Sequence, residues 1–247
     1  MMKISVCMAT YNGGKYLREQ MDSILGQDLS AYPEAELEII VSDDLSTDDT
    51  LQILESYHDE RIKVYKHTNK KSHKYYKSMF ACTENFANAM EKCTGDYIFL
   101  SDQDDIWHPM KISRSLDSMI QGGHDMCMVG FHIITPSRKK LGTVMYEREP
   151  RWRLRRKIKL YGFSCGFTRK EMLSYLPFPN IPHHDNFMML VSSFKNNYGI
   201  VNEPLALHKW DGYHNVSAFE DNSPFIVKNW YRFKQISVAY WRYLKSL

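Results

Sequence analysis

The chain has 247 residues, of which 43% are hydrophobic and 25% charged, proportions that are typical of a folded globular protein and exclude a largely disordered chain. Its 32 basic and 29 acidic residues leave a formal charge of +3, which excludes a histone-like protein with positive charge along its whole length. No run of about 18 consecutive apolar residues occurs, so we expect no membrane-spanning helix.

Short apolar runs alternate with helical patterns over roughly the first half of the chain. We expect strands at residues 4–8, 37–41, 62–65, 96–100 and 126–134. We expect helices at residues 16–25, 46–57 and 76–92, and a further helix that begins near Pro109. This alternation predicts an α/β fold with a mainly parallel, mixed sheet flanked by helices.

The N-terminus and the cysteines predict a cytoplasmic protein. The first apolar run is too short for the core of a signal peptide and is typical of a first strand. The 5 cysteines are odd in number, and none forms a Cys-x-x-Cys pair. Neither a disulfide framework nor a structural zinc site is therefore expected.

Polar side chains follow three of the expected strands, at the point where each strand ends. The three clusters are Thr10-Tyr11-Asn12, Asp43-Asp44 and Asp102-Gln103-Asp104-Asp105. In open α/β sheets, ligands bind outside the carboxyl ends of the strands, so the clusters predict one shared site. Asp and Asn are also common in turns and caps, which explains any single cluster without a ligand.

Several common enzyme motifs are absent. The first strand–helix turn contains Gly13-Gly14 and not Gly-x-Gly-x-x-Gly, which disfavours a nicotinamide or flavin enzyme. The chain also lacks the Gly-x-x-x-x-Gly-Lys-Ser/Thr loop of P-loop NTPases and the Gly-x-Ser-x-Gly turn of many serine hydrolases.

The acidic tetrad at residues 102–105 has the strongest chemical implication. Carboxylates that are packed together repel one another, so a cation is expected among them. Oxygen ligands of this kind suit Mg²⁺ or Mn²⁺, which is commonly held by one or two carboxylates and the phosphates of a substrate. The alternative is a charged turn before a helix N-terminus, which fits Asp105 better than Asp102.

Residues 5–13, 40–50 and 100–107 together resemble the family 2 glycosyltransferases, and in particular the rhamnosyltransferase-like branch of bacterial polysaccharide enzymes. The resemblance is strong over residues 3–120. It implies a glycosyltransferase-A type fold, in which a single catalytic domain at 1–222 has a nucleotide-sugar half (1–120) and an acceptor half (121–222). An amphipathic C-terminal helix at 223–247 would follow this domain.

The resemblance also implies roles for individual residues on the donor side. Thr10, Tyr11 and Asn12 would line the nucleotide pocket, Asp43 would bond the base with assistance from Asp44, and Asn85 would lie near the nucleotide. Asp102 would face the ribose or sugar and would share the metal with Asp104. Asp105 and Trp107 would line the sugar side of the cleft.

On the acceptor side, the His184-Asp185-Asn186-Phe187 segment resembles a family motif that makes Asp185 the general base. His183 and His184 either support this base or are polar residues after a proline turn. The 211–217 segment resembles a family loop in which a histidine lies beside the metal and the diphosphate. Either Asp211 or His214 takes that place, and His214 is favoured because its chemistry matches.

Two departures from the family pattern stand out. Leu45 replaces the glycine of the usual Asp-Asp-Gly-Ser motif, and a longer basic loop at 69–76 replaces the usual Asn-x-Gly loop. The second departure affects the nucleotide side of the site and points to a different donor.

Two segments are both basic and aromatic. Residues 148–159 carry a net charge of +6 and residues 225–247 a net charge of +5, which leaves −8 for the rest of the chain. This combination suits a helix that lies on an anionic membrane surface. The alternative is a solvated loop and a helix that packs on the domain or on a second subunit in a homodimer. No nucleic-acid-binding motif accompanies the charge.

The sequence therefore predicts a metal-dependent, inverting glycosyltransferase of cell-surface polysaccharide synthesis, with an Asp-x-Asp motif at Asp102–Asp104. The donor would be a UDP- or dTDP-linked sugar, and the acceptor a glycan or lipid-linked glycan. The protein would be cytoplasmic, with peripheral association at the inner face of the membrane. The alternatives are a nucleotidyltransferase that acts on sugar phosphates and a non-catalytic nucleotide-sugar-binding module.

Overall fold

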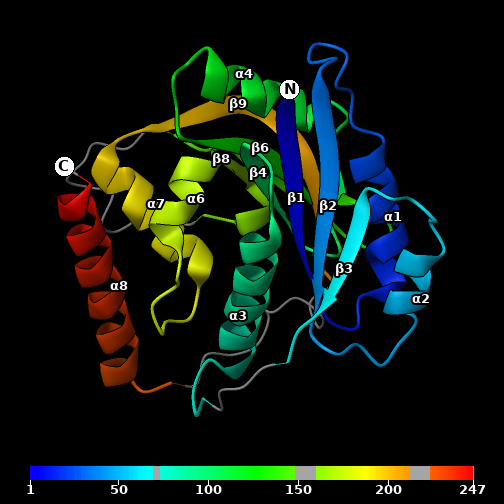
Figure 1. The fold of residues 1–247 in the computed structure, drawn as a ribbon. Helices are drawn as coiled ribbons and strands as arrows, with labels where there is room; N and C mark the ends of the chain where they lie inside the picture. The colour runs from blue at the N-terminus through cyan, green and yellow to red at the C-terminus, as the bar shows by residue number, and fades with distance from the viewer. Residues whose placement is uncertain (69–72, 148–159, 212–222, 247) are drawn as a thin grey trace.

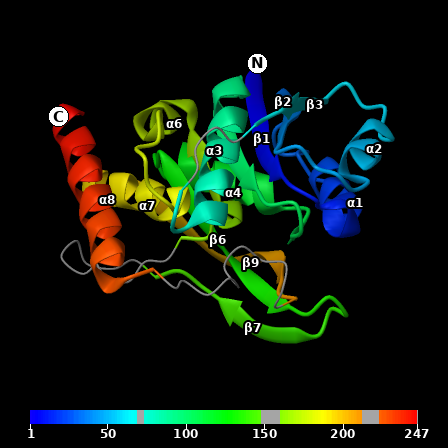
Figure 2. The ribbon, with the colours of Figure 1, turned by 90° about the horizontal axis from the view of Figure 1, so that it is seen from below.

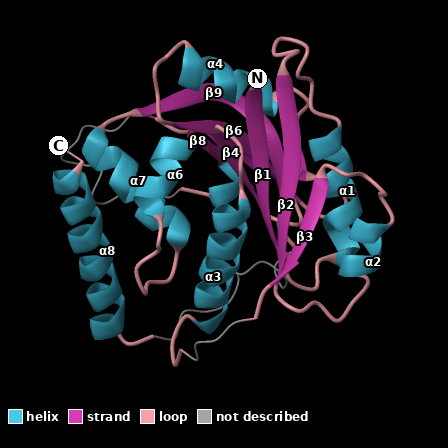
Figure 3. Ribbon diagram, in the orientation of Figure 1, coloured by secondary structure: helices cyan, strands magenta, loops and turns pink. Residues whose placement is uncertain are grey.

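The computed structural model describes residues 1–68, 73–147, 160–211 and 223–246. Within this part of the chain, nine strands form one sheet with helices on both faces, so the predicted α/β fold is confirmed (Figures 1 and 3). The strand order is β3-β2-β1-β4-β8-β6-β9-β5, and β7 pairs with β6 at the side of this path.

The first half of the sheet is parallel. It contains β1 (Met2–Thr10), β2 (Ala35–Asp43), β3 (Ile62–Lys66) and β4 (Tyr97–Ser101), and its crossovers are α1 (Gly14–Leu25), α2 (Thr50–Glu55) and α3 (Lys77–Lys92). Thr10 pairs with Asp43, so β1 and β2 end at the same level. The polar clusters after β1, β2 and β4 therefore lie at one edge of the sheet, as expected.

The second half of the sheet is mixed. The 4-residue strand β8 (Cys165–Thr168) runs antiparallel between β4 and β6 (Met126–Ile134), while β9 (Tyr198–Lys209) runs parallel to β6. Short β5 (Ile106–Trp107) pairs with β9, and β7 (Lys140–Val144) extends β6 as a hairpin that projects from the body (Figure 2). The remaining elements are α4 (Lys111–Ile120), η1 (Gly162–Ser164), α6 (Arg169–Tyr175), α7 (His184–Lys195) and α8 (Phe225–Lys245).

The central strands are buried on both faces. In β1, the consecutive residues Ile4 to Met8 are all fully buried, which explains why this strand reads as a continuous apolar run and not as an alternating one. The same holds for Ile39 to Val41 in β2.

One buried carboxylate ties together the far ends of the parallel strands. Glu38 on β2 accepts hydrogen bonds from Ser5 Oγ at 2.6 Å and from Thr94 N at 2.7 Å, and forms ion pairs with Lys3 and Lys63. Burial alone would raise the pKa of Glu38, but these hydrogen bonds hold it at about 2. The charged form of Glu38 is therefore strongly favoured by the fold.

We expect Glu38→Gln to destabilise the protein by about 2 kcal/mol at pH 7. A fall in pKa from 4.5 to about 2 corresponds to roughly 3 kcal/mol, which solvent screening of the two half-exposed lysines reduces. This stabilisation is present above pH 4.5 and is lost as the pH falls through 2. Urea unfolding of both proteins between pH 3 and pH 7 measures the difference, which should shrink toward pH 3. Glu36→Gln, at an exposed position nearer the beginning of the same strand, should show no such difference.

Candidate active site

The end of β1 is held by side chains from the two other clusters. Thr10 Oγ1 donates to Asp43 Oδ1 at 2.8 Å. The Gln103 amide accepts from Tyr11 N at 2.8 Å and donates to Tyr11 O at 3.0 Å, so it pairs with the backbone as a neighbouring strand would. A Cβ on Gly13 would lie 2.3 Å from Gln103 Oε1, which explains the glycine at this position. The Tyr11 side chain is left exposed.

The fully buried Asp43 carboxylate organises the turn after β2. It accepts from Ser46 N at 2.9 Å and Ser46 Oγ at 2.6 Å in addition to Thr10. Asn12 Oδ1 accepts from Thr47 N at 2.8 Å. These bonds occupy the residues expected to cap the next helix, and α2 begins instead at Thr50, whose N–H donates to Asp48.

Leu45 lies at the centre of this turn with a φ of 58°, in the left-handed region that favours glycine. Its side chain is largely exposed, so little burial offsets the strain. The turn thus has the backbone conformation of a glycine although a leucine occupies it.

We expect Leu45→Gly to stabilise the protein by about 0.5–1 kcal/mol, because relief of left-handed strain outweighs the added freedom of the unfolded chain. The midpoint of thermal unfolding should rise by about 1–4 °C. Leu141→Gly on β7, an equally exposed leucine without a positive φ, should lower it. A lower midpoint for Leu45→Gly would contradict the strain argument.

Asn85, on α3, faces the same strand end. Its Nδ2 donates to Thr10 O at 3.0 Å, and its Oδ1 is buried without a hydrogen-bond partner among the described residues. Thr10 O also accepts from Asp44 N at 2.9 Å. Asn85 therefore supports the end of β1 from behind, whereas Asp44 is half-buried at the beginning of the turn after β2.

Asp102 and Asp104 are half-buried at the end of β4. Burial, and then the charges of Asp105 and Asp104, raise the pKa of Asp102 well above its usual range. Burial and the Asp105 charge raise the pKa of Asp104 to about 7. The fold thus holds these two carboxylates where their ionised forms are unfavourable without a cation.

Asp105 is fully buried and is bound by a histidine that the sequence analysis did not identify. Asp105 Oδ1 lies 2.7 Å from His208 Nδ1, and Oδ2 has no partner in the described part of the chain. Burial would lower the pKa of His208, but the charge and hydrogen bond of Asp105 raise it to about 9. Asp105 was expected to line the sugar side of the cleft, whereas in the structure it is buried, because pairing of Ile106 with Leu207 brings His208 onto it.

Trp107 also differs from its prediction. Its ring is 3% exposed and packs edge-on against Phe99 inside the core, with Lys111 Nζ 3.1 Å from the ring centre. It does not line the cleft, because β5 directs this residue inward. Burial lowers the pKa of Lys111 to about 7.

Asp185 reaches the site from α7. This helix begins after His183, whose φ of 60° turns the chain sharply, and Asp185 Oδ1 accepts from Asn186 N at 2.7 Å in its first turn. His184 is buried against Phe86 and Phe178, and burial lowers its pKa to about 3. His184 is therefore a neutral packing residue at neutral pH.

The candidate site residues come together near Cys82 on α3, a residue that the sequence motifs do not single out. Burial raises the pKa of this thiol well above its usual range, and the charges of four carboxylates raise it further. These are Asp102, Asp185, Asp104 and Asp44. Carboxylates that directly follow β2 and β4, and one in the first turn of α7, thus lie close enough to Cys82 for their charges to act on its thiol, although 141 positions separate the first of these aspartates from the last.

Asp211 and His214 were the two alternatives for a residue beside the metal. Asp211 pairs with Lys15 at 3.6 Å and accepts from Tyr16 OH at 3.1 Å, at the beginning of α1. His214 lies outside the described residues. The basic segment 148–159 and residues 69–72 of the longer basic loop also lie outside them.

The donor set fits a divalent cation that is shared with a ligand. In the part of the chain that the structure describes, no three His, Cys, Asp or Glu side chains form a group able to hold a metal by themselves. Asp102 and Asp104 together provide hard carboxylate oxygens in an environment that favours neutralisation by a cation. Such a pair suits Mg²⁺ or Mn²⁺ when phosphate oxygens complete the coordination.

Comparisons with known proteins identify relatives of this chain. The model of glycosyl transferase family 2 matches residues 5–195. The dTDP-rhamnosyl transferase RfbG of Shigella flexneri is 35% identical over 119 residues, which are 46% of this chain and 37% of that protein. The teichuronic acid biosynthesis glycosyltransferase TuaG of Bacillus subtilis, itself described as putative, is 26% identical over 84% of this chain and 82% of its own length. The chain thus spans about a third of one relative and most of the other.

Solved structures with the same fold include two that hold nucleotide sugars. TarS of Staphylococcus aureus with UDP-GlcNAc has a TM-score of 0.74 at 19% identity, covering 96% of this chain and 66% of that one. The mannosyltransferase PcManGT of Pyrobaculum calidifontis with GDP-Man and Mn²⁺ has a TM-score of 0.57 at 16% identity, covering 97% and 71%. These likenesses establish the glycosyltransferase-A fold.

Proposed function

The chain belongs to glycosyl transferase family 2, and we propose that it transfers a sugar from a nucleoside diphosphate to a hydroxyl group of a glycan, with inversion at the anomeric carbon. The observation that carries this proposal is the convergence of Asp185 with Asp102 and Asp104 beside Cys82. Asp102 and Asp104 would bind the charged leaving group with a cation, and Asp185, which lies near them, is a carboxylate that can act as a base.

The donor would bind along the ends of β1 and β2. The exposed Tyr11 ring, which Gln103 holds by its backbone, offers a face for the base, and Asp44 lies at the rim. Thr10, Asn12 and Asp43 act mainly by fixing this edge, because their side-chain oxygens are already engaged with one another and with the following turn.

Asp102 and Asp104 would hold a divalent cation together with the diphosphate, and Mn²⁺ in PcManGT supports this assignment. When bound, the cation neutralises negative charge that develops on the leaving diphosphate. The Asp105–His208 pair lies behind these residues and holds the tetrad in place through β9.

Asp185 would take the proton from the acceptor hydroxyl as its oxygen attacks the anomeric carbon. The new carbon–oxygen bond forms while the bond between the anomeric carbon and the diphosphate oxygen breaks, and the electron pair leaves with the nucleoside diphosphate. One base is sufficient, because a single in-line displacement inverts the configuration and needs no covalent sugar–enzyme intermediate.

The names of the relatives support a role in cell-surface polysaccharide synthesis with a dTDP-linked donor. UDP-GlcNAc in TarS supports a UDP-linked donor, and a relative in Campylobacter jejuni named as a glucosyltransferase of an undecaprenol-linked glycan supports a lipid-linked acceptor. A nucleotidyltransferase that acts on sugar phosphates remains the second candidate from the sequence. No structural observation favours it.

A donor panel tests this proposal. The purified protein is incubated with UDP-GlcNAc, dTDP-rhamnose and GDP-mannose, each with Mn²⁺, Mg²⁺ or EDTA, and thermal unfolding is measured. A donor at 100 times its dissociation constant should stabilise the protein by about 2.7 kcal/mol, and EDTA should abolish the effect. Product analysis should then show a nucleoside diphosphate, whereas pyrophosphate would indicate a nucleotidyltransferase. No donor-dependent stabilisation and no turnover would contradict the proposed function.

A further inference from the structure

The outer face of α8 is an unusually apolar surface. Residues 226, 230, 233, 237, 240 and 244 follow one another at intervals of four and three, which places them on one side of a helix. Together with Trp241 we call them the outer stripe: Ile226, Trp230, Phe233, Ser237, Tyr240, Trp241 and Leu244. Ile226 is 77% exposed, Phe233 64% and Trp230 60%.

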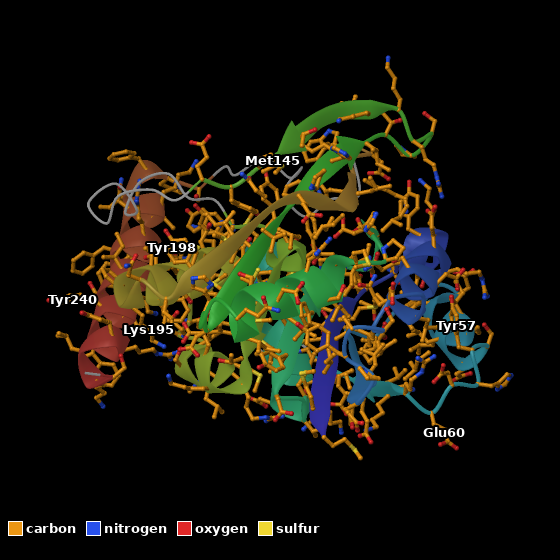
Figure 4. All side chains as sticks on the ribbon, turned by 90° about the horizontal axis from the view of Figure 1, so that it is seen from above. Tyr57, Glu60, Met145, Lys195, Tyr198 and Tyr240 are labelled. Atoms are coloured by element: carbon orange, nitrogen blue, oxygen red, sulfur yellow. The ribbon has the colours of Figure 1, made fainter. Side chains whose placement is uncertain are left out.

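This helix is fixed on the body by its opposite face. Arg242 donates to carbonyl groups at the end of α6, among them Ser174 O at 2.9 Å, and Gln235 Nε2 donates to Pro182 O at 2.7 Å. α8 packs against α7 and lies at the outside of the molecule in two perpendicular views (Figures 1 and 2). Tyr240 projects from it on the side away from the sheet (Figure 4). The outer stripe is therefore held in a fixed orientation. Within the described chain its side chains are largely exposed, although the Tyr240 ring also lies edge-on to Phe194 of α7.

Basic side chains flank the stripe, and α8 contains no acidic residue. At 100° per residue, Lys234 and Lys245 lie along one border, Arg232 lies beyond the other, and Lys228 lies on the side opposite the stripe. Lys245 Nζ lies 3.7 Å from the centre of the Trp241 ring, at the edge of the apolar surface. Aromatic rings bordered by cations are what a helix needs to lie in the headgroup region of an anionic bilayer.

We propose that the outer stripe of α8 docks the protein on a lipid bilayer that contains anionic headgroups. Charge favours a bilayer over a second copy of the chain, because α8 carries five cations and no acidic residue that could pair with the cations of a facing copy. None of the described helices is long and apolar enough to cross a membrane, so the helix would lie on the surface.

The docked face is physically connected to the candidate base. Lys234 donates to Asn180 O at 2.8 Å and Gln235 to Pro182 O, so α8 holds the segment that leads into His183 and Asp185. Tyr231 packs edge-on against Phe80 and Tyr76, at the beginning of α3. A bilayer on α8 would therefore lie beside the acceptor half of the site, where a lipid-linked acceptor would be presented. This last step rests on the proposed function, whereas the docking itself does not.

Vesicle flotation with the full chain tests the docking. Wild-type protein should float with vesicles of phosphatidylcholine and phosphatidylglycerol in equal parts, and much less with pure phosphatidylcholine. The triple variant Trp230→Ser, Phe233→Ser, Trp241→Ser should bind at least tenfold more weakly. Leu141→Ser on β7 is the matched control, because Leu141 is 54% exposed and Trp241 53%, and it should bind like the wild type.

Three outcomes would overturn the proposal. The first is that the wild-type protein fails to float with the anionic vesicles in 0.1 M salt. The second is that the triple variant binds as well as the wild type, which would assign the binding to another segment. The third is a homodimer that the triple variant dissociates, without vesicle binding. Donor turnover measured on the same samples without lipid reports on the proposed function separately.

Discussion

Asp185→Asn should reduce sugar transfer by about a thousandfold while leaving the fold and donor binding unchanged. A positioned general base contributes about 10²–10⁴-fold, and an amide cannot accept the proton of the acceptor hydroxyl. The substitution preserves the local structure, because an Asn side chain can still accept the hydrogen bond from Asn186 N in the first turn of α7. Steady-state kinetics with saturating donor, and thermal shift with donor and Mn²⁺, measure the two properties separately.

Asp59→Asn is the matched control for this experiment. Asp59 lies in the turn before β3, where it pairs with Arg61, far from the site. Its variant should turn over like the wild type. A turnover of Asp185→Asn within threefold of the wild type would remove Asp185 from the role of base. His184 is not a substitute candidate, because its buried, low-pKa ring packs between Phe86 and Phe178.

The half of the site on the parallel strands could be predicted from the sequence because its signals are local. Each of β1, β2 and β4 is a short apolar run followed directly by polar residues, and parallel pairing places those ends at one edge. The family resemblance covers the same stretch and is confirmed by the family model. The turn at Leu45 was predictable for the same reason. The family pattern places a glycine at this position, and Leu45 has the left-handed backbone conformation that favours glycine.

The directions of Asp105 and Trp107 could not be predicted, because they depend on a strand about 100 residues away. Pairing of β5 with β9 places His208 on Asp105 and turns the Trp107 ring into the core. Nothing within the 102–107 segment specifies that pairing. The one sequence signal was the apolar run 205–207 that ends at His208, which is typical of a strand end but does not name its neighbour.

Cys82 was missed for a related reason. It lies on the face of α3 that looks toward the carboxylates, but the 3.6-residue pattern of that helix does not distinguish a site-facing residue from a core residue. The structural part of Thr10, Asn12 and Asp43 could not be predicted either. The sequence does not show that their side chains form hydrogen bonds with one another and with the turn after β2.

Asp104→Asn should make the metal-free protein more stable and abolish both its response to metal and its turnover. The folded pKa of Asp104 is raised from 3.8 to about 7, so its ionised form costs free energy in the fold. The stability that the protonated form contributes is present below pH 3.8 and is lost as the pH rises through 7. At pH 8 the variant should therefore exceed the wild type by roughly 1–3 kcal/mol, and at pH 5 by less.

The opposite sign at Glu38 provides the control for this prediction. Both substitutions replace a buried or half-buried carboxylate with its neutral amide, but the fold holds the Glu38 pKa at about 2 and the Asp104 pKa at about 7. Neutralisation should therefore destabilise at position 38 and stabilise at position 104, measured by urea unfolding at pH 8 with EDTA. With Mn²⁺ and donor, the wild type and Glu38→Gln should gain stability and Asp104→Asn should not. A loss of metal-free stability in Asp104→Asn would mean that this carboxylate serves the fold. A gain would show that the fold tolerates an unfavourable charge at this position, as a cation site requires.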